Sequence, residues 1–290
     1  MNVLSLFDGI SCGRVALERA GIKVDNYFAS EIDKFAIEIA KKNYPDTVHV
    51  GSVVDVRARR LPKIDILIGG SPCQGFSFAG KQLNFEDARS KLFFEYVRLL
   101  KHCKPKYFLL ENVKMKKEYQ DVITEYLGVE PILINSALVS AQNRQRLYWT
   151  NIPNIEQPED RGILLRDILE DGCVDRDKSY CIDANYFKGG NIKQYFDKGR
   201  RQLIFKYGHC KIREYKQDSG KTPTLTTMQG GHREPKVLID NYRKLTPIEC
   251  ERLQTLPDNY TDGVSNSQRY KQLGNGWTVD VIAHIFKGIK

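Results

Sequence analysis

Short apolar runs of β type alternate with helix-like segments through the first half of the chain, and this alternation constrains the fold more than any other feature. The apolar runs lie at residues 3–7, 27–29, 64–68 and 107–110, and helix-like segments follow at 13–20, 32–43, 90–103 and 117–127. Such alternation predicts an α/β fold with a mostly parallel, Rossmann-like sheet covered by helices. In open sheets of this kind, ligands bind at the carboxyl ends of the strands.

The alternation ends near Pro153, where a polar, glycine-punctuated and basic region begins. From Arg176 to Asp240 the chain carries 14 Lys and Arg against 7 Asp and Glu, which accounts for most of the formal net charge of +9. This excess indicates either a solvated surface or a patch that binds a polyanion. Helix signals return at residues 246–249, a capping box with proline at the first helical position, and at 277–286. The chain therefore divides into residues 1–152, a smaller lobe at 153–242, and a C-terminal segment at 243–290.

Apolar segments and cysteines exclude several classes of protein. No stretch approaches the roughly 20 apolar residues that span a bilayer. The first residues reach the acid Asp8 too early for a secretory signal, so a cytoplasmic location is expected. The seven cysteines form no Cys-x-x-Cys pair, which predicts reduced thiols and no metal site.

The turn after the first apolar run has the form of a cofactor-binding turn. Residues 7–13, Phe-Asp-Gly-Ile-Ser-Cys-Gly, leave the first strand and open the first helix, where glycine lets the backbone approach a ligand. Glu31 ends the second strand about twenty residues on, where such folds place a carboxylate on ribose hydroxyls. Alone, Glu31 is equally typical of a helix N-terminus. Together the two features favour a nucleotide-like cofactor, either a dinucleotide or S-adenosylmethionine.

A loop at residues 69–77, Gly-Gly-Ser-Pro-Cys-Gln-Gly-Phe-Ser, leaves the carboxyl end of the strand at 64–68. A cysteine is more often a buried apolar residue than a nucleophile. Cys73 differs by its context, because Pro72 fixes the backbone before it and the flanking glycines keep the loop open. Cys73 is therefore a candidate nucleophile at the edge of the sheet where ligands bind.

Three motifs in a fixed order carry a family resemblance. Ser71-Pro72-Cys73-Gln74, Glu111-Asn112-Val113 and residues 142–146, Gln-Asn-Arg-Gln-Arg, resemble the catalytic motifs of the DNA cytosine-5 methyltransferases. Supporting matches run from Phe7 to Asn151 and from Arg243 to the C-terminus. Residues 4–10 and 68–73 are similar to the animal de novo branch, whereas the small central region resembles bacterial or viral members. The resemblance implies a Rossmann-like S-adenosylmethionine-dependent methyltransferase sheet, a target-recognition domain at 153–242, and a C-terminal segment that returns to the catalytic domain.

The resemblance also implies the catalytic roles. Cys73 supplies a thiolate that adds to carbon 6 of cytosine, and Glu111 gives ring nitrogen 3 a proton or strong hydrogen bond. Arg146 binds the carbonyl oxygen of the base, while Arg144 orders the nucleophile loop and polarises the ring. Because the two arginines are two positions apart, they point to the same side of an extended segment. No residue is recognisable as the base that removes the carbon 5 proton, and water is a candidate.

S-adenosylmethionine is the cofactor that the resemblance implies. The implied cofactor site departs from the family at one position. Members of the family usually have an aspartate at the position after His49-Val50-Gly51, where it binds the adenine amino group. This chain has Ser52 there, with Asp55 three residues later. Either residue can take that role. The implied cofactor contacts are Phe7, Asp8, Gly9, Ile10, Gly13, Glu31, Ile32, Ser52, Val53, Pro72, Leu92, Asn275, Gly276 and Trp277.

Double-stranded DNA is the implied partner, with a cognate restriction endonuclease where one exists and the monomer as the active form. Since a duplex hides carbon 6 in the stack, the base must be flipped out while the basic lobe holds the phosphates. The implied DNA contacts are Gln74, Ser77, Thr224, Leu225 and Thr226. The alternatives are an RNA cytosine methyltransferase, a catalytically silent regulator that binds the same ligands, and a dinucleotide oxidoreductase.

Overall fold

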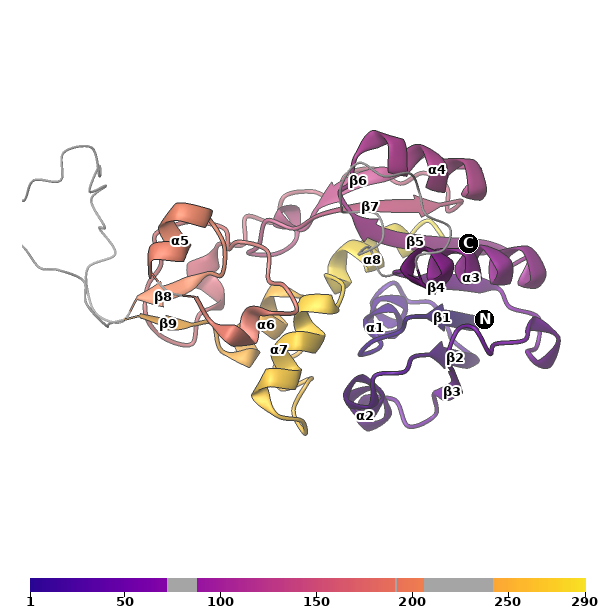
Figure 1. Cartoon of the computed structure of the whole chain (residues 1–290), viewed down its shortest axis with the longest axis horizontal. Coiled ribbons are helices and arrows are strands. Elements are labelled where there is room, and N and C mark those ends of the chain that lie inside the picture. The colour runs from indigo at the N-terminus through magenta and orange to yellow at the C-terminus, as the bar shows by residue number, and fades with distance from the viewer. Residues whose placement is uncertain (72–87, 191, 206–241) are drawn as a thin grey trace, which may run out of the picture.

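A seven-stranded sheet with helices on both faces forms the larger part of the molecule (Figure 1). The structure is a computed structural model, and it describes residues 1–71, 88–190, 192–205 and 242–290. The strand order is β3-β2-β1-β4-β5-β7-β6. Neighbouring strands from β3 to β5 are parallel, and β7 is antiparallel to both β5 and β6. The strands are β1 (Asn2–Leu6), β2 (Asn26–Ser30), β3 (Val48–Gly51), β4 (Ile66–Gly69), β5 (Tyr107–Val113), β6 (Ile132–Asn135) and β7 (Gln145–Thr150).

Alternate residues of the central strands enter different cores, because side chains in a strand point to opposite faces in turn. Val3 of β1 and Ile66 of β4 belong to one cluster, whereas Leu4 and Leu67 belong to the other. The first cluster includes residues of α1 (Cys12–Arg19), α2 (Lys34–Asn43) and α8 (Val279–Phe286). The second includes residues of α3 (Ala88–Cys103) and α4 (Lys117–Leu127). The predicted α/β fold, with a mostly parallel sheet covered by helices, is confirmed.

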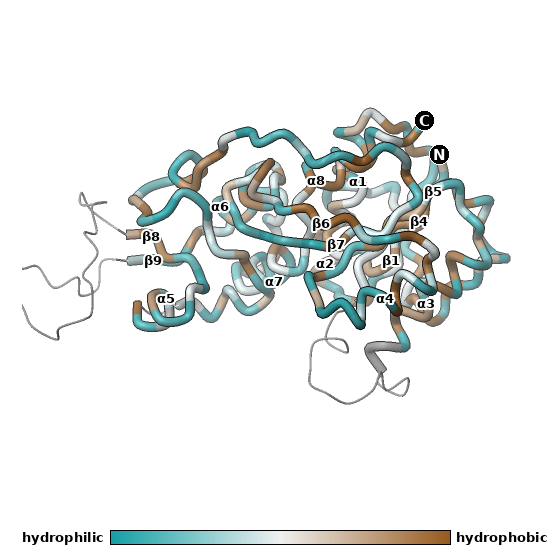
Figure 2. Tube along the Cα trace, turned by 90° about the horizontal axis from the view of Figure 1, so that it is seen from above, coloured by the Kyte–Doolittle hydropathy of each residue, from teal (hydrophilic) through white to brown (hydrophobic). Residues whose placement is uncertain are grey.

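The smaller part of the molecule lies at the far end from β3 and carries its own small core (Figures 1 and 2). A two-stranded antiparallel sheet joins β8 (Leu203–Phe205) to β9 (Tyr242–Lys244), with α5 (Ile192–Lys198) nearby. The Arg176 guanidinium stacks on Tyr180, 3.9 Å from the ring centroid. Short 3-10 turns complete the described elements: η1 (Ala58–Arg60), η3 (Ser136–Leu138), η4 (Leu165–Ile168) and η5 (Tyr186–Lys188).

The C-terminal segment returns to the large sheet through three helices, α6 (Pro247–Leu253), α7 (Asn266–Asn275) and α8. As predicted, Thr246 caps α6: its hydroxyl accepts a hydrogen bond from the Glu249 amide, while the Glu249 carboxylate accepts one from the Thr246 amide. α8 packs against α1, and Lys106 at the start of β5 donates to the carbonyl of Lys290 at 3.0 Å. The last helix therefore lies beside the first.

Two further observations bear on the expectations from composition. In the parts of the chain that the structure describes, no helix is both long enough and apolar enough to cross a membrane. Cys12, Cys103, Cys181 and Cys250 carry free thiols, but Cys173 is disulfide-bonded. The expectation that all thiols are reduced is therefore wrong at Cys173, because the absence of Cys-x-x-Cys pairs says nothing about cysteines that are distant in sequence.

Candidate active site

A pocket of about 450 Å³ lies at the carboxyl ends of the parallel strands. Its wall is built from the segments that follow β1, β2, β3 and β4, from the last residues of β5, and from β7, α3 and the end of α7 with the residues after it. The predicted residues that line it are Phe7, Asp8, Gly9, Glu31, Ile32, Ser52, Val53, Leu92, Glu111, Arg144, Arg146, Asn275, Gly276 and Trp277. The pocket thus brings together the cofactor and catalytic candidates from both ends of the chain.

Glu31 is held at the end of β2 by three backbone amides. Its Oε2 accepts a hydrogen bond from the Gly9 amide at 2.8 Å, and its Oε1 accepts from the amides of Ile32 and Asp33 at 2.7 and 2.9 Å. A carboxylate oxygen has two lone pairs, so Oε2 keeps capacity for a further donor. The carboxylate can accept a ligand hydroxyl without giving up the contact that ties β2 to the first turn.

Asp8 lies at the base of the same turn and is almost fully buried. Its carboxylate accepts hydrogen bonds from the hydroxyls of Tyr27 at 2.7 Å and Ser11 at 2.5 Å. Burial raises the pKa of Asp8, even though these hydrogen bonds favour the charged form. Asp8 therefore shapes the turn from below as well as lining the pocket.

Part of the pocket wall is apolar. The Ile32 side chain is 77% exposed, and Val53 and Leu92 also line the wall. Ser52 lines the pocket, whereas Asp55 is exposed and is not among the lining residues. Of the two candidates for an adenine amino group, Ser52 is the one that the structure brings to the cavity.

Two predicted cofactor residues lie outside the pocket wall. The Ile10 side chain is buried in the core beneath it. Gly13 lies below the Trp277 ring, where a Cβ would stand 2.4 Å from Cδ1 of Ile68 and 3.4 Å from Cζ3 of Trp277. Glycine is thus needed at position 13 for close packing under the pocket. From sequence alone, this need cannot be distinguished from a glycine that lets a ligand approach the backbone. The remaining predictions, Pro72, Cys73, Gln74, Ser77, Thr224, Leu225 and Thr226, lie outside the described residues.

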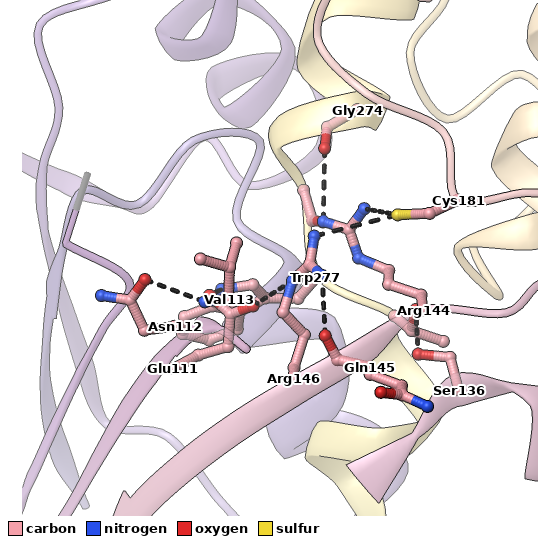
Figure 3. Close-up of polar contacts among 12 residues, drawn as sticks. Glu111, Asn112, Val113, Ser136, Arg144, Gln145, Arg146, Cys181, Gly274 and Trp277 are labelled. Carbon is pink, nitrogen blue, oxygen red and sulfur yellow. Dashed lines mark hydrogen bonds and ion pairs between the residues drawn. The ribbon is translucent and has the colours of Figure 1, made fainter. Parts of the chain in front are cut away.

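Glu111 sits near the carboxyl end of β5 with donors on both of its oxygens (Figure 3). Its Oε1 lies 2.9 Å from Nε of Arg146, and its Oε2 accepts a hydrogen bond from the indole Nε1 of Trp277 at 3.2 Å. Burial is the largest single influence and would lower the pKa of Arg146, but the charge of Glu111, together with Cys181 and Tyr148, outweighs it and the pKa is raised. Glu111 and Arg146 therefore form a charged pair at the inner end of the pocket.

Arg144 is buried and its guanidinium is held by main-chain carbonyls (Figure 3). It donates to the carbonyls of Ile182, Gly274 and Gly276 at 3.0, 3.2 and 2.8 Å, and to Sγ of Cys181 at 3.3 Å. Burial, and then the neighbouring charge of Arg146, lowers the pKa of Arg144. Arg144 thus joins β7 to the lobe segment at 181–182 and to the end of α7.

Several pocket residues were not predicted as contacts. Asp33 caps α2, and its carboxylate also accepts hydrogen bonds from Lys271 at 2.8 Å and Gln272 at 3.1 Å. These hydrogen bonds connect α2 to α7 at one rim of the pocket. The sequence indicates Asp33 only as the N-cap of a helix and gives no sign of its contact with α7. The other lining residues that were not predicted are Cys12, Ser30, Gly70, Ser71, Asn112, Val113, Gln272 and Gly274.

Comparison with known proteins agrees with this geometry. The chain matches, over residues 1–290, a family model described as C-5 cytosine-specific DNA methylase. It is 34% identical to the type II methyltransferase M1.ScrFI of Lactococcus lactis subsp. cremoris, over 97% of the chain and 76% of that protein. It is 32% identical to M.NlaX of Neisseria lactamica, over 100% of the chain and 96% of that protein.

Solved structures match the fold at lower identity. The Entamoeba histolytica methyltransferase EhMeth superposes with a TM-score of 0.75 and 19% identity, covering 100% of the chain and 99% of its own. A Spodoptera frugiperda DNMT2 mutant gives a TM-score of 0.72, also at 19% identity, covering 99% and 98%. These two matches establish the fold, while the family model and the curated relatives establish the family. The chain belongs to the C-5 cytosine-specific DNA methylases.

Proposed function

We propose that this chain transfers a methyl group from S-adenosylmethionine to carbon 5 of a cytosine in duplex DNA, through a covalent adduct with Cys73. One observation carries the proposal: the Glu111–Arg146 pair lies in the same pocket as the Glu31 turn. A group held at Glu31 and a base held at Glu111 would share one cavity. The Cys73 loop leaves β4, the strand that lies between β1 and β5.

The cofactor end of the pocket suits S-adenosylmethionine. The free capacity of Glu31 Oε2 fits a ribose hydroxyl, and the exposed Ile32 side chain offers an apolar surface for a purine ring. Ser52 offers a hydroxyl that can accept from an adenine amino group. When bound there, the cofactor supplies an electrophilic methyl group on sulfur.

The residues of the chain make the base reactive. The Cys73 thiolate forms a bond to carbon 6, the 5,6 double bond breaks as a double bond forms between carbons 4 and 5, and the Glu111 carboxyl group, protonated when the base binds, donates its proton to ring nitrogen 3. Arg146 binds the carbonyl oxygen at carbon 2. Carbon 5 would then take the methyl group, with S-adenosylhomocysteine as the leaving group. Its proton passes to water, the carbon–sulfur bond breaks and nitrogen 3 returns its proton to Glu111, which restores the thiolate, the 5,6 double bond and the Glu111 acid.

The proposal includes the division of the chain. Residues 1–152 hold the cofactor and the catalytic groups, 153–242 recognise the target, and 243–290 complete the catalytic domain as the C-terminal return in the fold supports. Gln74, Ser77, Thr224, Leu225 and Thr226 contact the DNA. We propose that one copy of the chain suffices, that it works in the cytoplasm, and that any restriction endonuclease partner acts on the same sequence.

The test begins with bisulfite sequencing of plasmid DNA from cells that express the chain, which reads activity and target sequence together. A duplex with that target carrying 5-fluorocytosine should then capture the protein covalently when S-adenosylmethionine is present, because fluorine cannot leave as a proton does. Cys73→Ala should abolish the adduct and leave DNA binding largely intact, since the thiol contributes chemistry. Binding of the fluorinated duplex without any adduct refutes the proposal. A parallel assay on tRNA separates DNA from RNA as substrate.

A further inference from the structure

Trp277 contacts both ends of the pocket. It follows α7 in the C-terminal return, and its side chain lines the cavity beside Asn275 and Gly276. Its indole N–H also donates to Oε2 of Glu111, 166 positions away in sequence (Figure 3). One side chain therefore faces the cofactor end and holds the catalytic carboxylate.

Two glycines leave the space that this arrangement needs. A Cβ at Gly70 would stand 3.0 Å from Nε1 of Trp277 and 3.1 Å from Oε2 of Glu111, so it would press on both partners of the hydrogen bond. A Cβ at Gly13 would meet Cζ3 of Trp277 at 3.4 Å. Neither glycine has a positive φ, so space, rather than backbone conformation, explains glycine at these positions.

The hydrogen bond completes the restraint on the Glu111 carboxyl group. Arg146 holds Oε1 from β7, while Trp277 holds Oε2 from the C-terminal return. The indole N–H is a donor only and is fixed on a rigid, partly buried ring, so it cannot exchange roles with the carboxylate. In the proposed reaction Arg146 turns to the carbonyl oxygen of the base, and Trp277 then remains as the donor that fixes the orientation of Glu111.

We infer that Trp277 is a positioning residue for catalysis: its indole N–H orients Glu111 towards ring nitrogen 3 of the target cytosine. This inference rests on the proposed function. It gives Trp277 a second role besides its proposed contact with the cofactor. The rate of attack by Cys73 on carbon 6 then depends on a residue of the C-terminal return that acts through Glu111.

The test removes the N–H and keeps the aromatic ring. Trp277→Phe should lower the single-turnover rate of methyl transfer about 10-fold or more, because a hydrogen bond to a charged group is lost. A second variant, with benzothienylalanine at position 277, keeps the volume of the bicyclic ring and should show the same loss. In this second variant, binding of S-adenosylhomocysteine, measured by calorimetry, should change by no more than about 2-fold, since the whole bicyclic face stays in place.

Two further readouts separate positioning from general damage. In a Glu111→Ala background, where position 111 offers the indole no side-chain acceptor, Trp277→Phe should cause no further loss of rate, because the two changes remove one interaction. Exchange of the carbon 5 hydrogen for deuterium, measured without a methyl donor, should slow in Trp277→Phe as well, since it needs Cys73 and Glu111 but no cofactor. Circular dichroism and melting temperature confirm that each variant is folded.

Each other outcome overturns the inference. Full activity in the benzothienylalanine variant would show that the N–H is not needed. An equal loss in the Glu111→Ala background would show that Trp277 acts elsewhere. A loss of cofactor affinity that matches the loss of rate in the benzothienylalanine variant would make Trp277 a cofactor contact alone. If the wild-type protein neither methylates DNA nor forms an adduct, the proposed function itself has failed, and the wild-type measurement identifies that case.

Discussion

Gly274→Ala is the substitution whose effect can be worked out most directly. Gly274 lies in α7 against the backbone that precedes η5, and an added Cβ would stand 2.2 Å from C of Asp183, 2.3 Å from its O, and 2.4 Å from N of Ala184. Real Cβ atoms do not approach other atoms so closely, and the neighbours are main chain rather than the end of a flexible side chain. The lobe segment must therefore move away from α7.

Two opposite effects set the magnitude. Overpacking costs about 1–3 kcal/mol, and a clash with main-chain atoms belongs at the upper end. Alanine in place of glycine inside a helix recovers about 1 kcal/mol, so the expected net loss is about 2 kcal/mol. For a chain of this size, that loss corresponds to a fall in melting temperature of about 4–8 °C.

Activity should fall further than this loss of stability explains. The displaced segment carries the carbonyl of Ile182, which accepts a hydrogen bond from Arg144, and Gly274 itself supplies a second acceptor. Differential scanning calorimetry and single-turnover methylation at 25 °C measure the two effects. Ser267→Ala, at an exposed position of the same helix, is the control and should change stability by no more than about 0.5 kcal/mol. A melting temperature for Gly274→Ala equal to that of wild type would refute the reasoning.

Three other changes test the pocket. Glu31→Gln places an amide against backbone N–H groups and should weaken S-adenosylhomocysteine binding about 10-fold or more in calorimetry; unchanged affinity would contradict the placement of the ribose. Burial acts to raise the pKa of Asp33, but hydrogen bonds from Lys271 and Gln272 hold it below the usual value. Its contribution to stability is therefore fully present above about pH 4 and is lost as the pH falls through the depressed pKa, so Asp33→Asn should lower the melting temperature at neutral pH by an amount that shrinks as the pH falls below about 4. Burial raises the pKa of the Cys12 thiol to about 12, so mass spectrometry should find Cys12 unmodified by iodoacetamide in the native protein at pH 8 and modified after unfolding.

Strand periodicity explains why most of the large sheet is predictable. β1 and β4 are buried on both faces, so each is a short, nearly continuous apolar run that stands out from the amphipathic helices that follow in the chain. The capping box at Thr246 predicts the start of α6 in the same local way. β3, with half-exposed and exposed residues, and α7, which is polar along most of its length, have no comparable local signal. Their place is set by pairing with β2 and by the buried contacts of α7 with distant segments.

In the pocket, too, some residues can be predicted from local sequence and others cannot. Glu31, Glu111 and the two arginines are predictable because their positions at strand ends follow from local sequence, and motif order connects them. The partners that orient them are not local. Arg144 ends on carbonyls of Ile182, Gly274 and Gly276, and any residue type at those positions offers a carbonyl, so no sequence pattern can indicate the contact.

Gly13 and Gly70 show that a glycine in a turn can serve a purpose that its local sequence does not indicate. Gly13 is predicted as a cofactor contact but lies outside the pocket wall, whereas Gly70 is expected only to keep the nucleophile loop open and lines the pocket. The space beside both glycines is taken by Trp277, and at Gly70 by Glu111 as well, so part of what glycine provides is room for side chains of this chain. Glycines in such turns can therefore also be required by packing between segments that are distant in sequence. For that reason Gly70→Ala should lower the methylation rate of wild type but have a smaller effect in Trp277→Phe, where the atom nearest the new methyl group is gone; an equal effect in both backgrounds would assign Gly70 to the nucleophile loop alone.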